Sequence, residues 1–395
     1  MKILLIHDVK KPFGGGEKFV EDIEVLLKSY GNIVYKYYGS EQEDCSVFGA
    51  ISKFYNLKQK KILKKIIAKF SPDIVISNGT NRVITESIDR YLYKNKIYHI
   101  KIIHSYSYFC PKTWAIFKNG KPCNKGYNAL CLIYKCKSSK EGVNYILYYI
   151  LKWLKVGLHR ITMKNFVNHF ICPSAFLAEC MKKSLKLSDA KVTFLPHFIE
   201  IDKNSYINFD NINPKQFLFV GRISSEKGID IAIKAIALLK KWGIQDAVLK
   251  IIGDGSELGI LQKLVIQLQV INQIRFIGFI PHSQIDKYYQ DSIAVIVPSV
   301  CMETFGLINI EAMKNKTPVI ASNIGAIQDI VEHGTTGYLF EMGNYIELAK
   351  YMRKLYNNKK LSIKLGEAGY AKVLKEFNKE SYYKRLMEIC RRHQE

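Results

Sequence analysis

The sequence predicts an α/β protein made of two domains, each built on a parallel sheet covered by helices. Short apolar runs alternate with amphipathic stretches along the whole chain, which is the pattern of repeated strand–helix–strand units. With 395 residues the chain is too long for one hydrophobic core, so two domains of roughly 200 residues are expected. The composition, 48% hydrophobic and 24% charged, excludes disordered, collagen-like and disulfide-scaffold classes.

The predicted elements follow from hydrophobic periodicity. Amphipathic helices are expected at Glu17–Lys28, Asp230–Lys241 and Ser256–Leu268. Short apolar segments predict strands at 2–6, 73–77, 98–103, 216–220, 247–252, 274–277 and 293–297.

The domain boundary is expected where periodicity is lost. Residues 198–215 are rich in Asn and Asp, so we place a linker there, between an N-terminal domain of residues 1–197 and a C-terminal domain of residues 216–395. The last helix of the second domain is a candidate to pack back on the first. Ligands of such domains bind at the carboxyl ends of the parallel strands.

Targeting and membrane-spanning segments are not expected. Met1–Asp8 has a short apolar run that ends in a His-Asp pair, which predicts a buried strand and not a signal peptide. Val143–Leu158 is too short to span a bilayer and is interrupted by Lys152 and Lys155. Five of the nine cysteines occur singly, which is typical of reduced thiols in a cytoplasmic protein.

The net charge of +24 is unevenly distributed along the chain. Residues 1–50 carry −2, residues 51–200 carry +20 and residues 201–395 carry +6. Such an excess predicts an anionic partner, which could be nucleic acid, acidic lipid or a phosphorylated substrate.

Two cations leave a predicted strand-to-helix loop in the second half. Arg222 and Lys227 lie between Gly221 and Gly228, directly after a strand. Both side chains can reach one diphosphate there, while the glycines let backbone approach it closely. A solvated basic loop is the alternative interpretation.

A second motif, Glu303–Glu311, follows the strand at 293–297. A helix that opens near Gly306 presents backbone N–H groups suited to an anion, and the two carboxylates can accept hydrogen bonds from sugar hydroxyls. Alternatively, Glu303 is an ordinary acid at a helix start and Glu311 a surface residue. Glycine turns follow two further strands, at Gly253–Gly255 and Gly325.

Taken together, the order and spacing of these segments resemble the donor-binding domain of glycosyltransferase family 4. The resemblance covers residues 216–345 and extends more loosely into the first half. It rests on Gly221-Arg222, Glu226-Lys227-Gly228, Ile252–Gly255, Phe276–Gly278, Glu303–Gly306, Glu311-Ala312, Pro318–Ala321 and His333–Gly337.

This resemblance implies the GT-B architecture, in which two Rossmann-like domains face a central cleft. It also implies transfer of a sugar from a nucleotide-sugar with retention of configuration and no metal at the diphosphate, consistent with the lack of an Asp-x-Asp motif. Arg222 and Lys227 would hold the diphosphate, Glu303 the donor sugar and Glu311 the ribose. The other implied donor-binding residues are Gly15, Gly16, Gly221, Gly253, Gly278, Phe305, Gly306 and Leu307.

The first half carries further matches to this family. Gly14–Gly16 follows the first strand and is either a ligand-binding loop or a flexible turn. His104, after the strand at 97–103, would touch the donor sugar or assist the acceptor proton, although Ser105 stands where the family has Asp. At the hinge His197 replaces the usual Asn.

Four cysteines cluster in an insertion at residues 110–136. Cys110, Cys123, Cys131 and Cys136 could hold a structural zinc ion, or they are independent thiols.

Residues 144–155 combine aromatic and aliphatic side chains with lysines. They predict either a helix in a membrane interface or one packed on the N-terminal sheet. The first interpretation suggests a cytoplasmic enzyme at the inner face of a membrane, acting on a glycan or lipid-linked acceptor with a UDP-sugar as the guessed donor. An epimerase or hydrolase of nucleotide-sugars is an alternative. A nucleic-acid-binding protein is supported by charge alone, so nucleic acid is not the expected partner.

Overall fold

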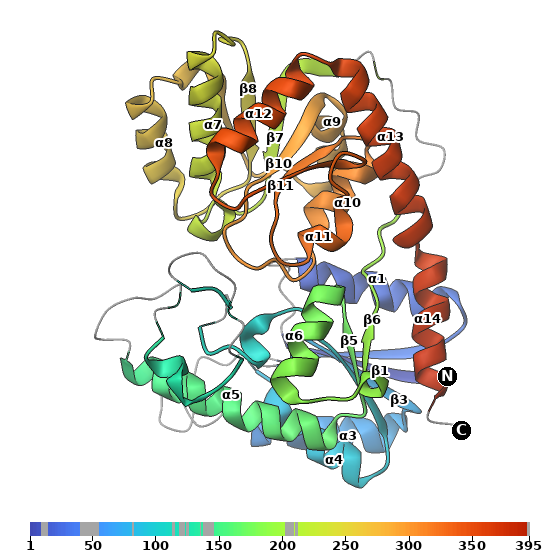
Figure 1. The fold of residues 1–395 in the computed structure, drawn as a ribbon. Helices are drawn as coiled ribbons and strands as arrows, with labels where there is room; N and C mark the ends of the chain where they lie inside the picture. The colour runs from blue at the N-terminus through green and yellow to red at the C-terminus, as the bar shows by residue number, and fades with distance from the viewer. Residues whose placement is uncertain are drawn as a thin grey trace. The chain divides into compact units, whose positions relative to one another are not determined.

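The computed structural model describes most of the chain and divides it into two units. The first unit consists of Met1–His197 with Lys379–Glu395, and the second of Phe198–Asn378. Figure 1 shows both units as sheets covered by helices. The described residues are 1–8, 15–39, 55–80, 83–112, 115–117, 123, 126–134, 136, 146–201, 209 and 212–392.

The first unit contains a parallel six-stranded sheet in the order β2-β1-β3-β4-β5-β6. The three strands expected here are confirmed as β1, β3 and β4. The other three were missed because β2 is only half-buried and β5 and β6 are very short. The strands are β1 Lys2–His7, β2 Ile33–Tyr38, β3 Ile74–Asn78, β4 Tyr98–Ile102, β5 His169–Cys172 and β6 Val192–Phe194.

Helices cover this first sheet. Leu4, Ile6 and Val75 of the sheet pack with Leu63 and Ile67 of α3 in a core that also includes α4. The helices are α1 Gly15–Ser29, α3 Leu57–Phe70, α4 Asp89–Lys94, α5 Ile146–Phe166, α6 Ala175–Leu185 and α14 Lys379–Arg391, with 3₁₀ turns η1 Thr85–Ser87, η2 Tyr106–Tyr108, η3 Ala129–Leu132 and η5 Asp189–Lys191.

The C-terminal helix α14 belongs to the first unit. Tyr383 stacks on Tyr30 with ring centroids 3.8 Å apart, and the guanidinium of Arg385 donates to the carbonyl of Phe194 at 2.6 Å. The chain thus returns to the unit in which it began.

Buried charges join β4 to the helices that cover it. The Lys101 ammonium lies 2.9 Å from the Asp89 carboxylate with both side chains fully buried, and burial raises the pKa of Asp89 to about 6. His159 of α5 pairs with Glu86 at 2.5 Å, also in the interior. The first pair fixes α4 against β4, and the second fixes the inner face of α5 against η1.

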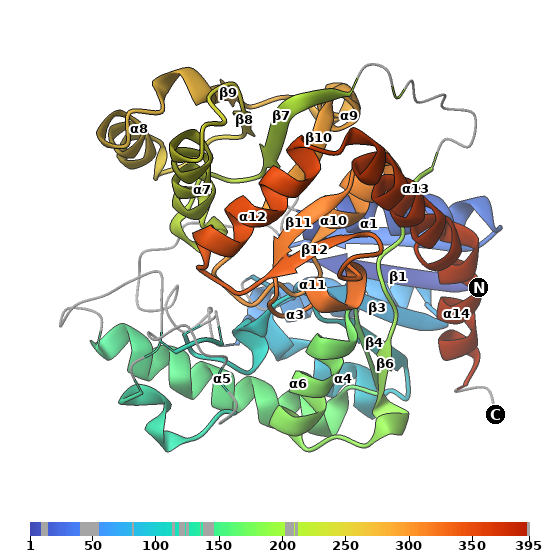
Figure 2. The same cartoon turned by 45° about the horizontal axis from the view of Figure 1, so that its top comes forward.

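The second unit has its own parallel sheet, in the order β12-β11-β10-β7-β8-β9 (Figure 2). The four expected strands are confirmed as β7 to β10. The expected linker 198–215 is too long, because β7 already begins at Asn213, whose N–H donates to the carbonyl of Asp291. The strands are β7 Asn213–Val220, β8 Val248–Ile252, β9 Ile274–Gly278, β10 Ser292–Val297, β11 Val319–Ser322 and β12 Gly337–Phe340.

The helices of this unit pack on both faces of its sheet. The predicted helices at Asp230–Lys241 and Ser256–Leu268 are confirmed as α7 and α8, and α7 lies beside α12 in both views (Figures 1 and 2). The helices are α7 Ile229–Lys241, α8 Leu258–Gln267, α9 His282–Gln290, α10 Leu307–Lys314, α11 Ile327–Ile330, α12 Tyr345–Tyr356 and α13 Lys359–Glu376, with 3₁₀ turns η7 Ser225–Lys227 and η8 Ile271–Gln273.

Each sheet has one point where the strand order reverses. In the first unit this point lies between β1 and β3, and in the second between β7 and β10. In doubly wound sheets, ligands bind at the carboxyl ends of the two strands that flank such a point. Among the described residues no helix is long and apolar enough to cross a membrane.

Candidate functional site

In the second unit, the loops after β7 and β10 touch at the reversal point. Gly228 has φ +63°, and a Cβ there would lie 2.1 Å from the carbonyl oxygen of Pro298. Only glycine therefore permits this approach. The N–H of Val300 donates to the carbonyl of Glu226 at 2.9 Å and ties the two loops together.

A charged pair bridges these loops. The Lys227 ammonium lies 2.8 Å from Oε1 of Glu303, and the Ser299 hydroxyl donates to the same oxygen at 2.7 Å. Burial alone would raise the pKa of Glu303, but Lys227 and Ser299 hold it below its usual value. Burial would likewise lower the pKa of Lys227, but Glu303 raises it. Both groups are therefore ionised.

Arg222 stands at the exposed side of this pair. Its side chain is 68% exposed and its guanidinium lies 3.4 Å from Glu226, a distance typical of a loose ion pair. Its positive charge also contributes to the low pKa of Glu303. A guanidinium so weakly held can turn toward an anionic ligand at little cost.

The loop after β10 ends at the N-terminus of α10. Gly306 caps this helix with φ +99°, and its carbonyl accepts from both the backbone and the side-chain amide of Asn309. Phe305 is buried against Phe377. Gly325 packs closely against the backbone of this loop, because a Cβ at position 325 would lie 2.7 Å from the carbonyl oxygen of Glu303. The backbone around Phe305, Gly306 and Leu307 is therefore held rigidly at a helix tip suited to anions.

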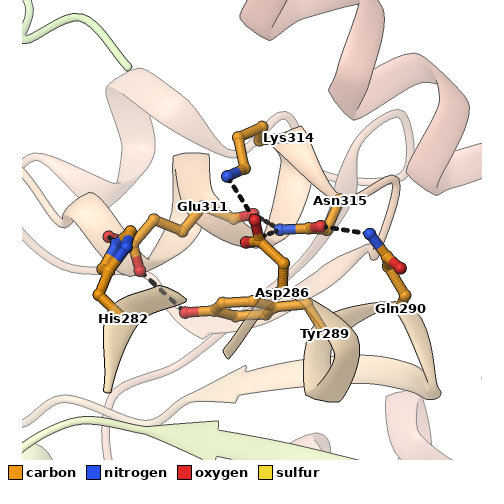
Figure 3. A network of polar contacts seen from close by, with 7 residues as sticks. All are labelled: His282, Asp286, Tyr289, Gln290, Glu311, Lys314 and Asn315. Carbon is orange, nitrogen blue, oxygen red and sulfur yellow. Dashed lines mark hydrogen bonds and ion pairs between the residues drawn. The ribbon is translucent and has the colours of Figure 1, made fainter. Parts of the chain in front are cut away.

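Glu311 lies on the second turn of α10 and is 12% exposed, which rules out the surface interpretation. The Tyr289 hydroxyl donates to Oε2 at 3.0 Å, and Nε2 of His282 lies 3.2 Å from Oε1. Figure 3 shows both partners reaching Glu311 from α9. The same two helices are also joined by Lys314 and Asn315 to Asp286, and by Gln290 to Asn315.

Three of the expected glycines meet at the carboxyl edge of β7, β8 and β9. The N–H of Gly253 donates to the carbonyl of Gly278 at 2.8 Å, and the N–H of Gly221 to the carbonyl of Ile252 at 3.0 Å. A Cβ at Gly253 would lie 1.9 Å from the carbonyl oxygen of Gly221. The structure thus brings the loops of Gly221, Gly253 and Gly278 together along one edge.

In the first unit, His104 follows β4 and meets residues from two other strand ends. Its Nε2 contacts Oδ1 of Asn78, the last residue of β3, and its Nδ1 lies 3.1 Å from Nε2 of His197 after β6. Nδ1 of His7, at the end of β1, lies 2.6 Å from the carbonyl of Asn78. Both ring nitrogens of His104 are therefore engaged by protein.

His104 and His197 are neutral. Burial lowers the pKa of His104 to about 3, with a further contribution from His7, and burial lowers the pKa of His197 well below its usual value. In this arrangement His104 is a hydrogen-bonding group and a poor base at neutral pH.

The glycine run lies near this cluster. Gly15 and Gly16 open α1, which places Phe19 against His197 with ring centroids 3.7 Å apart. Gly14, also part of that prediction, and residues 144 and 145 of the predicted interfacial helix lie outside the described residues.

The clustered cysteines do not form a metal site in the described part of the chain. No three His, Cys, Asp or Glu side chains gather there closely enough to hold a metal ion. Burial raises the pKa of Cys136 to about 11, and the charges of Cys110, Cys123 and Cys131 add to this effect. Cys110, Cys123 and Cys131 therefore lie within electrostatic reach of Cys136.

Sequence reasoning missed the residues that orient these groups. Ser299, Tyr289 and His282 hold the two carboxylates, and Asn78 and His7 surround His104. A polar residue at the end of a buried strand was the available signal for His7 and Asn78.

The fold and the site define a class: two Rossmann-like units, the second with an ionised Lys227–Glu303 pair beside a helix tip at its reversal point. Residues 201–372 match the family of glycosyl transferases group 1. This match covers less than half of the chain, and the segment is similar to members of that family.

Individual glycosyltransferases are similar to parts of this chain. The chain is 36% identical over 123 residues to an uncharacterised glycosyltransferase of Methanocaldococcus jannaschii, covering 31% of each chain. It is 29% identical over 184 residues to the amylovoran biosynthesis glycosyltransferase AmsK of Erwinia amylovora, covering 45% of each. The matched segments thus span less than half the length of these curated relatives.

The solved structure of HepE from Anabaena in complex with UDP superposes with a TM-score of 0.68 at 17% identity, over 98% of this chain and 99% of that one. The predicted fold class, an α/β protein with two Rossmann-like domains of the GT-B type, is confirmed.

The buried histidines make stability depend on pH. Because His197 and His104 stay neutral when folded but bind protons when unfolded near pH 6.5, acid favours unfolding. We expect the free energy of unfolding to fall by up to about 2 kcal/mol per histidine between pH 6.5 and 5. The variant His197→Gln should show a shallower loss in urea unfolding followed at several pH values. Asp89 has a raised pKa, so its protonation in acid favours the folded state instead. If the free energy of unfolding of His197→Gln falls with pH as steeply as that of the unaltered chain, His197 is not a buried neutral histidine.

Proposed function

We propose that the chain is a retaining glycosyltransferase that moves a sugar from a nucleotide-sugar to a hydroxyl of an acceptor. The observation that carries this proposal is the bridge between Lys227 and Glu303 at the reversal point, beside the tip of α10. A nucleotide-sugar leaves as a diphosphate, and preorganised positive charge on that group lowers the barrier.

The site supplies this charge from the protein itself. Lys227 and Arg222 would bind the diphosphate oxygens, and the N–H groups at the tip of α10 would complete the contact. Glu303, released in part from Lys227 as phosphate oxygens arrive, would accept hydrogen bonds from sugar hydroxyls. Glu311, oriented by Tyr289 and His282, would bind the ribose. These roles need no metal ion at the diphosphate.

We propose a same-face substitution for the chemical step. The acceptor oxygen forms a bond to the anomeric carbon while the bond from that carbon to the phosphate oxygen breaks. The proton of the acceptor hydroxyl passes to the leaving phosphate, and the nucleoside diphosphate departs. His104, neutral and held by Asn78 and His197, fits a positioning or hydrogen-bonding role better than that of a base.

For the donor we propose a UDP-sugar, supported by the UDP named in the HepE structure. For the acceptor we propose a glycan or lipid-linked glycan in the synthesis of a cell-surface polysaccharide. The amylovoran relative and the +20 charge of residues 51–200 support this choice. Such an enzyme would work on the cytoplasmic side of a membrane as a peripheral protein.

The donor site is tested by nucleotide-sugar turnover with UDP-, GDP- and ADP-sugars. We expect Lys227→Ala to lower kcat about 100- to 1000-fold, since it removes a preorganised charge from the leaving group. Glu303→Ala should also reduce turnover strongly. Lys234→Ala breaks an exposed ion pair with Asp230 in the same unit and should leave turnover unchanged.

Product analysis distinguishes the alternatives of the same fold. Transfer gives a glycosylated acceptor of unchanged anomeric configuration, whereas an epimerase or hydrolase gives an altered or free sugar without an acceptor. Turnover at the wild-type rate in both Lys227→Ala and Glu303→Ala would refute the site.

The ribose role of Glu311 predicts an effect of its buried partner. Tyr289→Phe removes one hydrogen bond to Glu311, so KM for the donor should rise about three- to tenfold while kcat is retained. Tyr356→Phe, which removes a hydroxyl contact to Asp246 on the surface of the same unit, is the matched control. An unchanged KM in Tyr289→Phe contradicts the proposed role of Glu311.

A structural zinc held by Cys110, Cys123, Cys131 and Cys136 stays a proposal, and it requires the thiols to move closer than they lie here. Elemental analysis of the purified protein should find close to one zinc per chain, because a structural site is near full occupancy. A content below about a tenth of an equivalent refutes it.

A further inference from the structure

Helix α5 carries two apolar stripes on opposite sides. Tyr149, Val156, His159 and Met163 form the inner stripe, which is buried in the first unit. A second set recurs at intervals of three or four residues and so shares one face over four turns. This outer stripe consists of Leu147, Ile150, Leu151, Leu154, Leu158 and Ile161, which are 36% to 66% exposed.

Helix α3, on the surface of the same unit, has a different pattern of exposed side chains. In α3 the buried residues are Gln59, Leu63 and Ile67, and lysines occupy the exposed positions between them. A helix that is apolar all round is typical of a buried or membrane-associated segment. The outer stripe of α5 therefore needs an apolar environment that the described residues do not supply.

The 3₁₀ turn η3 extends this surface. Leu130, Leu132 and Ile133 are exposed, Ile133 by 74%. The turn is fixed to α5 by residues that precede it. Tyr127 stacks on the Trp153 ring, and the Trp153 ring N–H donates to the carbonyl of Asn128 at 3.0 Å. The outer stripe and η3 together form one surface, here called the α5 surface.

Cations and aromatic rings border the α5 surface. Lys155 and Lys164 lie about a quarter turn to either side of the outer stripe, at about 100° per residue. The Lys152 ammonium, nearer the inner stripe, lies 5.7 Å from the ring centre of the exposed Tyr148. Lysines placed beside apolar stripes bury their stems while the charged ends reach the headgroups. Residues 51–200, which contain this surface, carry +20.

We propose that the α5 surface docks on an anionic lipid bilayer, with α5 lying in the plane of the interface. Its length and lysines suit an interfacial helix, which is held by buried apolar side chains together with attraction to anionic headgroups. A second copy of the chain is disfavoured as the occupant because two surfaces from segments of +20 would repel one another. This inference deepens the proposed membrane association, and its test needs no sugar donor.

The test is flotation of the purified full-length chain with vesicles of phosphatidylcholine alone or with 30% phosphatidylglycerol, roughly the content that gives a strongly negative surface. We expect binding to the anionic vesicles, weakened in high salt. The affinity of the variant Leu151→Ser/Leu154→Ser/Leu158→Ser for anionic vesicles should be at least about tenfold lower, since each apolar side chain contributes to insertion.

The matched control is Ile260→Ser/Ile266→Ser, which removes two exposed isoleucines of α8 in the second unit. It should bind as the unaltered chain does. Because all substituted residues are exposed, circular dichroism should show both variants folded. The proposal is overturned if the α5 variant and the unaltered chain float equally well with anionic vesicles. It is also overturned if the unaltered chain binds neither kind of vesicle. A concentration-dependent dimer that the α5 variant abolishes also overturns it. Loss of donor turnover with retained flotation would contradict the transferase proposal alone.

Discussion

The contact between Gly228 and the carbonyl of Pro298 is the constraint on which the candidate donor site depends. It lets the loops after β7 and β10 meet where the strand order reverses, and this in turn places Lys227 against Glu303. Any side chain at position 228 would separate the loops. The charge pair would then open to water, where its two members are worth far less to one another.

The same loops combine rigidity with one weakly held group. The loop after β10 is held by the close approach of Gly325 to Glu303 and by the hydrogen bonds of Asn309 and Ser299. Arg222, in contrast, is mostly exposed. A preorganised site avoids the cost of ordering its groups when the ligand arrives. In the proposed donor site the loosely paired Arg222 and the Lys227 held against Glu303 would therefore play different parts, although both are cations.

Sequence reasoning succeeded where local signals determine the outcome. Apolar runs identified the long buried strands, and glycine turns with nearby charges singled out Arg222, Lys227 and Glu303, which the structure brings close together. It missed β5 and β6 because three or four residues carry no periodicity. It also missed Tyr289, Asn78 and Ser299, because their importance comes from partners that only the folded chain brings close. The depressed pKa of His104 has the same origin, since burial cannot be read from one residue.

The two units use ionisable groups in opposite ways. At the end of the second sheet a carboxylate and an ammonium are kept charged by one another, which suits the binding of a charged leaving group. At the end of the first sheet burial keeps His104 and His197 neutral, so these two side chains offer hydrogen bonds and no charge. The excess positive charge of the first half therefore does not lie in its strand-end cluster. It belongs to surfaces such as the border of α5, where lysines flank exposed apolar side chains, and a bilayer satisfies both kinds of side chain at once.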